Sequence, residues 1–163
     1  IMLTGDSGSG KSSLSTILMD NNFSLVADDF SPMSISGNHY NFPSAISIKE
    51  GFYESATELY KINFESLKEY FINEIKGNAK YLPPDNKNEM VLSTRCNKLF
   101  NVKFGKNLSN EIKEVNKGIA LNKILPDAWI SNNIEHAESF INWVKGTKFY
   151  DLTYNNNEEI VLE

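Results

Sequence analysis

The sequence predicts an α/β fold, and three observations support this class. Residues 5–12 read Gly-Asp-Ser-Gly-Ser-Gly-Lys-Ser, a pattern of one glycine, four residues, a second glycine, a lysine and a serine. An apolar stretch over residues 1–4 precedes this run as a short buried strand, and an amphipathic helix follows it to about residue 20. A second predicted strand, residues 23–27, completes a strand–helix–strand unit, in which the carboxyl ends of parallel strands face one crevice.

Each residue type in the glycine-rich run has a physical role in binding phosphate. Its glycines let the backbone turn tightly and bring N–H groups around a polyphosphate. Lys11 can reach the terminal phosphates, Ser12 offers a hydroxyl to Mg²⁺, and the N-terminus of the next helix adds partial positive charge. We therefore predict that nine residues bind a nucleotide: Gly5, Asp6, Ser7, Gly8, Ser9, Gly10, Lys11, Ser12 and Ser13.

Two other interpretations of this run are a chance match in a Gly/Ser-rich loop and a dinucleotide-binding loop. The strand before the run and the helix after it argue against a chance match. The dinucleotide pattern Gly-x-Gly-x-x-Gly is not present, because the glycines at positions 5, 8 and 10 have the wrong spacing.

Length and composition narrow the class of protein further. A chain of 163 residues predicts a single domain, residues 1–163, which we expect to lack its N-terminal portion because it opens inside the strand before the loop. The net charge of −5 argues against a nucleic-acid partner, and no apolar run is long enough for a membrane span. The single cysteine excludes an intramolecular disulfide, so we expect a cytoplasmic protein.

Two adjacent acids, Asp28 and Asp29, follow the predicted strand over residues 23–27. In the expected unit they would lie beside the glycine-rich loop. Carboxylates in that position can coordinate a metal ion or take a proton from an attacking hydroxyl. A solvated turn explains the pair equally well on spacing alone.

The run LTGDSGSGKSSLSTILMDNNFSLVADDF, residues 3–30, resembles the catalytic core of the HPr serine kinase/phosphorylase family. That family's pattern is a Gly-Asp-Ser-Gly-x-Gly-Lys-Ser loop, a short helix and then Leu-Val-Ala-Asp-Asp, and the spacing here matches without a gap. The resemblance implies a β-rich P-loop kinase core with flanking helices, of the type this family shares with phosphoenolpyruvate carboxykinase. Residues 141–154 also resemble the end of shorter kinase-like relatives.

The resemblance also implies an activity and a role for each site residue. Its cofactors would be ATP and Mg²⁺, with Lys11 on the phosphates and Ser12 on the metal ion. Asp29 would be the general base on an acceptor serine, and Asp28 would orient Asp29 or lie in the outer coordination shell of the metal ion. The partner would be a protein or peptide that carries this serine, and the enzyme would be a homo-oligomer.

One stretch departs from the family pattern. Residues 47–51, Ser-Ile-Lys-Glu-Gly, stand where the family has a signature resembling Glu-Ile-Arg-Gly, so Ser47 replaces a metal-binding Glu and Lys49 an Arg. The resemblance therefore extends neither to HPr as the acceptor nor to phosphorolysis, and it favours shorter relatives, some associated with modification of ribosomally made peptides. Lys49 would neutralise phosphoryl charge or lie in an exposed loop. A small-molecule kinase and a nucleotide-binding regulatory module without transfer activity remain alternative functions.

Periodicity and turn signals predict the remaining elements. A turn at residues 36–39 separates short strands, and Pro126 and Gly146 end two helices. We expect strands over residues 33–35, 40–42, 45–48, 90–92, 99–104 and 148–154, and helices over residues 52–77, 110–124 and 134–146.

Four single residues could carry chemistry, and each also has a structural explanation. Arg95, the only arginine, would bind phosphate or form a surface ion pair. Cys96 has no His near it in sequence, so we expect a small buried side chain rather than a nucleophile. His39 could approach the site, although a solvated turn is the more frequent environment, and we expect His136 to be exposed.

Overall fold

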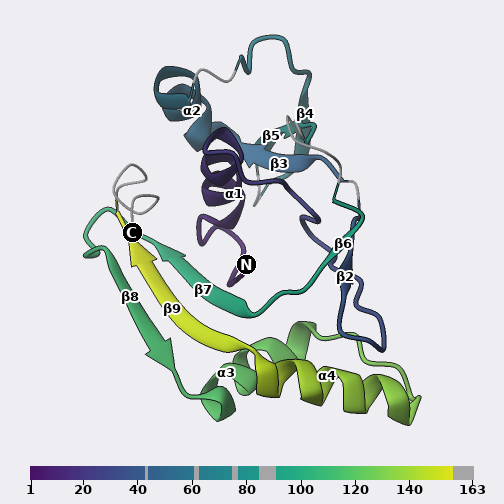
Figure 1. The fold of residues 1–163 in the computed structure, drawn as a ribbon. Coiled ribbons are helices and arrows are strands. Elements are labelled where there is room, and N and C mark those ends of the chain that lie inside the picture. Colours follow the sequence, from purple (N-terminus) through teal and green to yellow (C-terminus); the bar gives the residue numbers. More distant parts are fainter. Residues whose placement is uncertain (43, 61–62, 75–76, 85–90, 156–163) are drawn as a thin grey trace.

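The main sheet pairs the strand before the glycine-rich loop with strands from the second half of the chain. The computed structural model describes residues 1–42, 44–60, 63–74, 77–84 and 91–155 (Figure 1). Among these residues the sheet runs β1-β7-β9-β8, with β1, β7 and β9 parallel and β8 antiparallel to β9. These strands are β1 (Met2–Thr4), β7 (Lys98–Phe104), β8 (Glu111–Val115) and β9 (Lys148–Tyr154).

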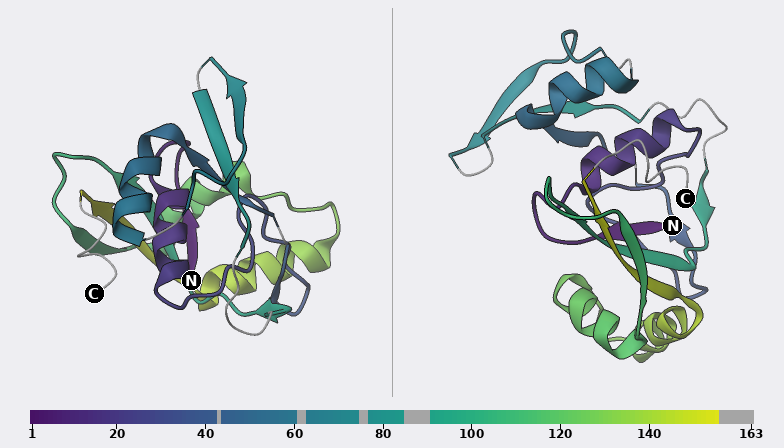
Figure 2. Two further views of the ribbon diagram at one scale, coloured as in Figure 1. Left: turned by 90° about the horizontal axis from the view of Figure 1, so that it is seen from above. Right: turned by 90° about the vertical axis from the view of Figure 1, so that its left-hand side faces the viewer.

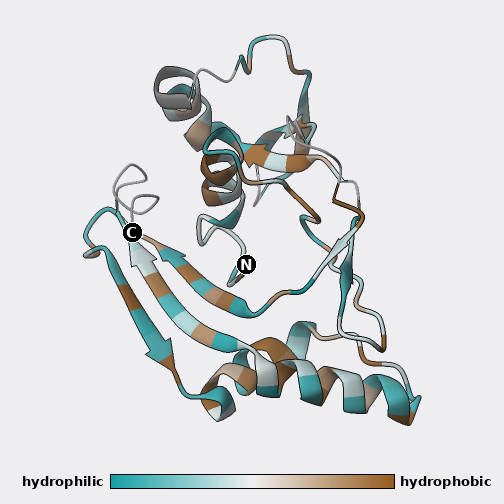
Figure 3. Ribbon diagram, viewed as in Figure 1, coloured by the Kyte–Doolittle hydropathy of each residue, from teal (hydrophilic) through white to brown (hydrophobic). Residues whose placement is uncertain are grey.

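Helices cover both faces of this sheet, so the protein is a mixed α/β structure with flanking helices (Figure 1). On one face, Leu99 and Phe149 pack in a buried cluster with α3 (Lys117–Ile124) and α4 (Ile134–Gly146). On the other face, Val102 and Leu152 pack against Leu14 of α1 (Lys11–Asp20). This alternation along β7 and β9 appears as changing hydropathy along the two strands in Figure 3.

A smaller antiparallel sheet lies on the far side of α1 (Figures 1 and 2). It has the order β3-β5-β4, and the 3₁₀ turn Glu50–Phe52 and helix α2 follow its first strand. Ile17 of α1 packs with Ile48, Ala56 and Phe64 in a buried cluster, so α1 contributes to two cores at once. The elements are β3 (Ile46–Lys49), α2 (Tyr53–Tyr60), β4 (Glu69–Asn73) and β5 (Gly77–Leu82).

The predicted strand over residues 23–27 is wrong. These residues belong to no regular strand and form one bridge, from Ala27 to Phe42, with the Phe42 amide donating to the Val26 carbonyl at 2.9 Å. Leu25 packs against the buried cluster around Ile17 and Ile48, so this stretch buries apolar surface without strand pairing. The parallel neighbour of β1 is β7, and in the described residues β1 lies at the edge of the sheet rather than at its centre.

Two predicted helices are wrong over part of their length. The helix expected over residues 52–77 ends at Tyr60, and residues 69–73 form β4; residues 61–62 and 75–76 lie outside the described part. The helix expected over residues 110–124 begins only at Lys117, because residues 111–115 pair with β9. Asn116 caps it, accepting a hydrogen bond from the Gly118 amide at 2.8 Å.

The other predicted elements have mixed outcomes. The helix over residues 134–146 and the strands at 45–48, 99–104 and 148–154 are confirmed within one residue. The strand expected at 33–35 forms one bridge, Met33 to His39, and β2 (His39–Tyr40) pairs with β6 (Ser93–Thr94). Residues 91–92 of the strand expected at 90–92 are not in a strand, and Met90 lies outside the described residues. No helix in the described ranges is long and apolar enough to cross a membrane.

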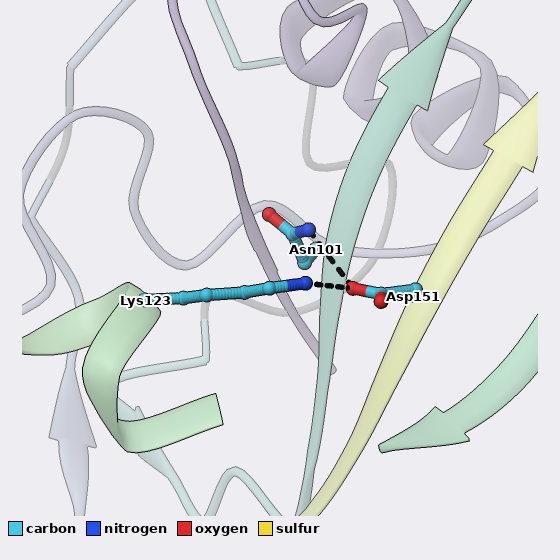
Figure 4. Close-up of polar contacts among 3 residues, drawn as sticks. All are labelled: Asn101, Lys123 and Asp151. Atoms are coloured by element: carbon cyan, nitrogen blue, oxygen red, sulfur yellow. Dashed lines mark hydrogen bonds and ion pairs between the residues drawn. The ribbon is translucent and has the colours of Figure 1, made fainter. Parts of the chain in front are cut away.

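A polar cluster ties α3 to the main sheet (Figure 4). The Lys123 ammonium of α3 and the Asn101 amide of β7 donate to the same Asp151 carboxylate oxygen of β9, at 2.6 and 2.9 Å. Partial burial raises the pKa of Asp151, but the hydrogen bonds from Lys123 and Asn101 outweigh it and leave the pKa below its ordinary value. The cluster therefore joins three elements through one ionised carboxylate.

Candidate nucleotide site

The glycine-rich loop runs between β1 and α1, as its sequence pattern requires. Gly10 has a φ of 94°, and a Cβ built there would overlap the Tyr154 hydroxyl and lie 2.9 Å from Cβ of Phe104. Gly5 has a φ of 135°, and its Cβ would lie 2.7 Å from the Val102 carbonyl oxygen. Both residues must therefore be glycine, for backbone conformation and for close approach to the sheet.

Three hydrogen bonds hold the end of the loop. The Phe104 amide donates to the Ser9 carbonyl at 2.9 Å, and the Tyr154 hydroxyl donates to the Gly10 carbonyl at 2.9 Å. The Leu14 amide, in the first turn of α1, also donates to Gly10 at 2.9 Å. The loop is thereby fixed to the carboxyl ends of β7 and β9, the edge at which α/β proteins bind ligands.

The Lys11 side chain folds back over the loop. Its ammonium donates to the carbonyls of Gly5 at 2.6 Å and Asp6 at 2.8 Å. Burial lowers the pKa of Lys11 below its ordinary value, and the charges of Asp6, Asp29 and Asp28 oppose that change. The charges of both acids therefore act on Lys11, although the pair does not follow a regular strand.

The two acids of the pair have different environments. Asp28 is partly buried, and the backbone N–H of Ser47 in β3 donates to its carboxylate. Burial, together with the charge of Asp29, raises the pKa of Asp28 above its ordinary value. Asp29 is exposed and lines the cavity described below. The solvated-turn explanation therefore fits Asp29 and not Asp28.

The raised pKa of Asp28 predicts a pH-dependent gain in stability for Asp28→Asn. Because the pKa of Asp28 is raised in the folded state, ionisation of this carboxylate lowers the free energy of unfolding. The loss begins as pH rises above the ordinary pKa of 3.8. The variant should therefore melt above the unmodified protein by about 2 °C or more at neutral pH, with the gain vanishing below about pH 4. Thermal denaturation over a pH series measures this difference. Glu138→Gln, at an exposed position in the middle of α4, is the control and should show no gain; a less stable Asp28→Asn at pH 7 would contradict the assignment.

Two residues near the site carried no clear signal in the sequence. Asp127, in the 3₁₀ turn Leu125–Asp127, is a third acid whose charge acts on Lys11; an acid directly after Pro126 was the available hint. His39 is buried, at 4% exposure, so the solvated-turn prediction is wrong. Its Nδ1 lies 3.0 Å from the Ser31 hydroxyl and its ring 5.6 Å from that of Trp143, contacts between distant segments that local pattern cannot predict.

The structural explanations hold for Cys96, His136 and Lys49, whereas Arg95 forms no ion pair within the described residues. Cys96 is buried, its thiol donates to the Lys98 carbonyl at 3.3 Å, and burial raises its pKa, which argues against a nucleophile. His136 is exposed, as predicted, with Nδ1 at 2.7 Å from the Ser131 hydroxyl. Arg95 is exposed and its Nε donates to Asn38 at 3.4 Å, and Lys49 is exposed at the end of β3.

A cavity of about 420 Å³ opens beside the acidic pair. It lies between residues 28–35, the first strand and α4, and both Asp28 and Asp29 contribute to its wall. Its volume is within the range of small-ligand sites in proteins. The charges of the acidic pair therefore act on Lys11 of the glycine-rich loop, and the pair also lines a separate cavity that could hold a second reactant.

The loop fits a nucleotide polyphosphate, and the donors near it fit a metal ion bound together with one. Gly8 has open space around its Cβ position and the Ser9 hydroxyl is buried without a partner, so the loop offers room and an unused polar group. In the described ranges, no three His, Cys, Asp or Glu side chains gather into a metal site. Mg²⁺ with a nucleotide needs only one or two protein oxygens, which Ser12 and Asp28 would supply. Comparisons of the chain with family models, curated proteins and solved structures found no match.

Proposed function

We propose that the protein is an ATP-dependent serine kinase, which transfers the γ-phosphoryl group to a serine hydroxyl of a protein or peptide. One observation carries this proposal: the ammonium of Lys11, in a glycine-rich loop, lies within electrostatic range of an acidic pair that borders a cavity. The lysine and the loop N–H groups suit a polyphosphate, and the exposed carboxylate suits an incoming hydroxyl. The resemblance of residues 3–30 to HPr kinases supports the same chemistry.

The proposed reaction assigns one task to each group. The Lys11 ammonium leaves the carbonyls of Gly5 and Asp6 and binds the phosphates, where it stabilises charge on the transferring group. Bound Mg²⁺, held by Ser12 and Asp28, would supply further neutralisation of phosphate charge. Asp29 takes the proton from the acceptor hydroxyl, whose oxygen forms a bond to the γ-phosphorus as the bond to ADP breaks.

The finer features of the proposal come from the resemblance. The fold would be a P-loop kinase core of the HPr kinase and phosphoenolpyruvate carboxykinase type, formed by residues 1–163 as one domain. The enzyme would act in the cytoplasm as a homo-oligomer, with no nucleic-acid or membrane partner. Ser47, in place of the family's metal-binding Glu, gives its backbone N–H to Asp28.

Asp29→Asn tests the proposed reaction. We expect turnover to fall about a hundredfold, because the amide cannot accept the serine proton, while ATP binding is largely retained. The assay incubates the protein with γ-labelled ATP and serine peptides, and calorimetry measures ATP affinity in parallel. Asp20→Asn is the control, since this acid is exposed at the far end of α1. Unchanged turnover in Asp29→Asn would remove Asp29 from its role.

A small-molecule kinase is a second candidate, because the cavity beside Asp29 is of the size that holds small ligands. The same assay distinguishes it, since label would then appear on a small hydroxyl compound and on no peptide. Tight ATP binding with no labelled acceptor of either kind would favour a regulatory module without transfer activity.

A further inference from the structure

The cavity beside the acidic pair has a strongly apolar wall that reaches the protein surface. Trp129 lines it and is 87% exposed, and Phe30, 43% exposed, lies against it with ring centroids 5.7 Å apart. Ile35 and Ile130 are further exposed residues of the same wall. Large apolar side chains left in water at a cavity mouth are typical of a surface that binds a partner.

The charged side chains that line the cavity are acidic. Three carboxylates, Asp28, Asp29 and Asp127, line it, and none of the described lining residues is a lysine or arginine. The Lys11 ammonium acts on these acids from the nucleotide side, where bound phosphates would occupy it. The cavity therefore attracts basic groups and repels acidic ones.

A buried polar atom gives an independent indication of a ligand. His39 lines the cavity, is 96% buried, and its Nε2 has no hydrogen-bond partner, while Nδ1 is engaged with Ser31. An unpaired polar group in a protein interior costs free energy unless something pairs with it. This nitrogen is a ready partner for a polar group of an incoming molecule.

We infer that this cavity binds a large apolar side chain of the acceptor peptide, next to the phosphorylated serine, in a segment with basic rather than acidic neighbours. The inference rests on the proposed function and names the substrate class for it. Asp29, the proposed base, is part of the cavity wall, so a side chain bound there places its own peptide backbone at the reacting group. The exposed Trp129 and Phe30 extend the contact beyond the cavity, which suits a peptide better than an enclosed small molecule.

The two tryptophans of the chain, Trp129 and Trp143, both line the cavity, so intrinsic fluorescence reports binding without a label. The probes are nine-residue peptides with one central serine and two lysines. In each peptide, one of the four residues nearest the serine is phenylalanine, and the other three are alanine. One reference peptide has four alanines, and another replaces the lysines by glutamates. At least one phenylalanine peptide should bind tenfold more tightly than the alanine peptide, and the glutamate peptide more weakly.

Trp129→Ala should remove this tenfold preference and leave Trp143 as the reporter. Truncation of a side chain that is 87% exposed spares the core. Phe71→Ala, on β4 and 69% exposed, is the matched control and should keep the preference. Equal binding of all peptides, or equal losses in the two variants, would overturn the inference. γ-Labelled ATP separates the two hypotheses. If phenylalanine peptides bind but never receive label, the kinase proposal is refuted and the peptide-binding cavity stands. If all peptides receive label equally, the peptide-binding cavity is refuted and the kinase proposal stands.

Discussion

Replacing Lys11 by alanine is expected to lower phosphoryl transfer from ATP on the order of a thousandfold while the fold persists. The ammonium is the cation nearest the loop carbonyls, at 2.6 Å from Gly5 and 2.8 Å from Asp6, so no other group in the loop can replace its charge on the phosphates. The fold should persist, because the buried clusters around α1 are made by Leu14 and Ile17 and not by the lysine.

Single-turnover transfer from γ-labelled ATP measures the loss, and circular dichroism with thermal melting checks the fold. Lys106→Ala is the matched control, because Lys106 is an exposed lysine in the turn after β7 and should transfer phosphate at the unmodified rate. A Lys11→Ala protein that stays folded and transfers phosphate within tenfold of normal would contradict the assigned role.

Gly10→Ala should be strongly destabilising, at about 3 kcal/mol or more. A left-handed conformation costs an alanine about 1–2 kcal/mol, and here the methyl group would also overlap the Tyr154 hydroxyl and crowd Phe104. Gly8→Ala is a close control, because Gly8 also has a positive φ, 86°, but open space around its Cβ position. It should lose only the conformational part, about 1 kcal/mol.

Urea denaturation measures both losses, and ATP titration shows whether the loop still binds. Adding Tyr154→Phe to Gly10→Ala should restore part of the stability, because it removes the hydroxyl that the new methyl overlaps. The restoration is partial, since Phe104 still crowds the methyl and the hydrogen bond from Tyr154 to Gly10 is lost. Equal losses in Gly8→Ala and Gly10→Ala would show that contact with the sheet does not matter.

Local chemistry explains which parts of the fold were predictable. The loop, its strand and its helix follow from residues within about 20 positions, and α4 has a regular apolar stripe ended by Gly146. Residues 111–115 carry apolar residues at a spacing that suits a helix, yet pairing with β9 makes them a strand. The partner of β1 was not predictable, because β7 lies some 95 residues further along the chain.

The candidate site also has features that local sequence predicts and features that it does not. Motif spacing predicts Lys11, Asp28 and Asp29 as candidate site residues, and in the structure the charges of both acids act on Lys11. The burial of His39 and the approach of Asp127 depend on how α4 and the turn before it pack over residues 28–35, which no local pattern encodes. Sequence therefore predicts candidate residues within one motif better than contacts between distant segments.

The bond between the Tyr154 hydroxyl and the Gly10 carbonyl joins residues 144 positions apart. During synthesis β7 and β9, which hold the glycine-rich loop, are translated after it. At 5–20 residues per second, the nascent loop waits about 7–30 s for its anchor. We therefore expect the proposed nucleotide binding to begin only after β9 has joined the sheet.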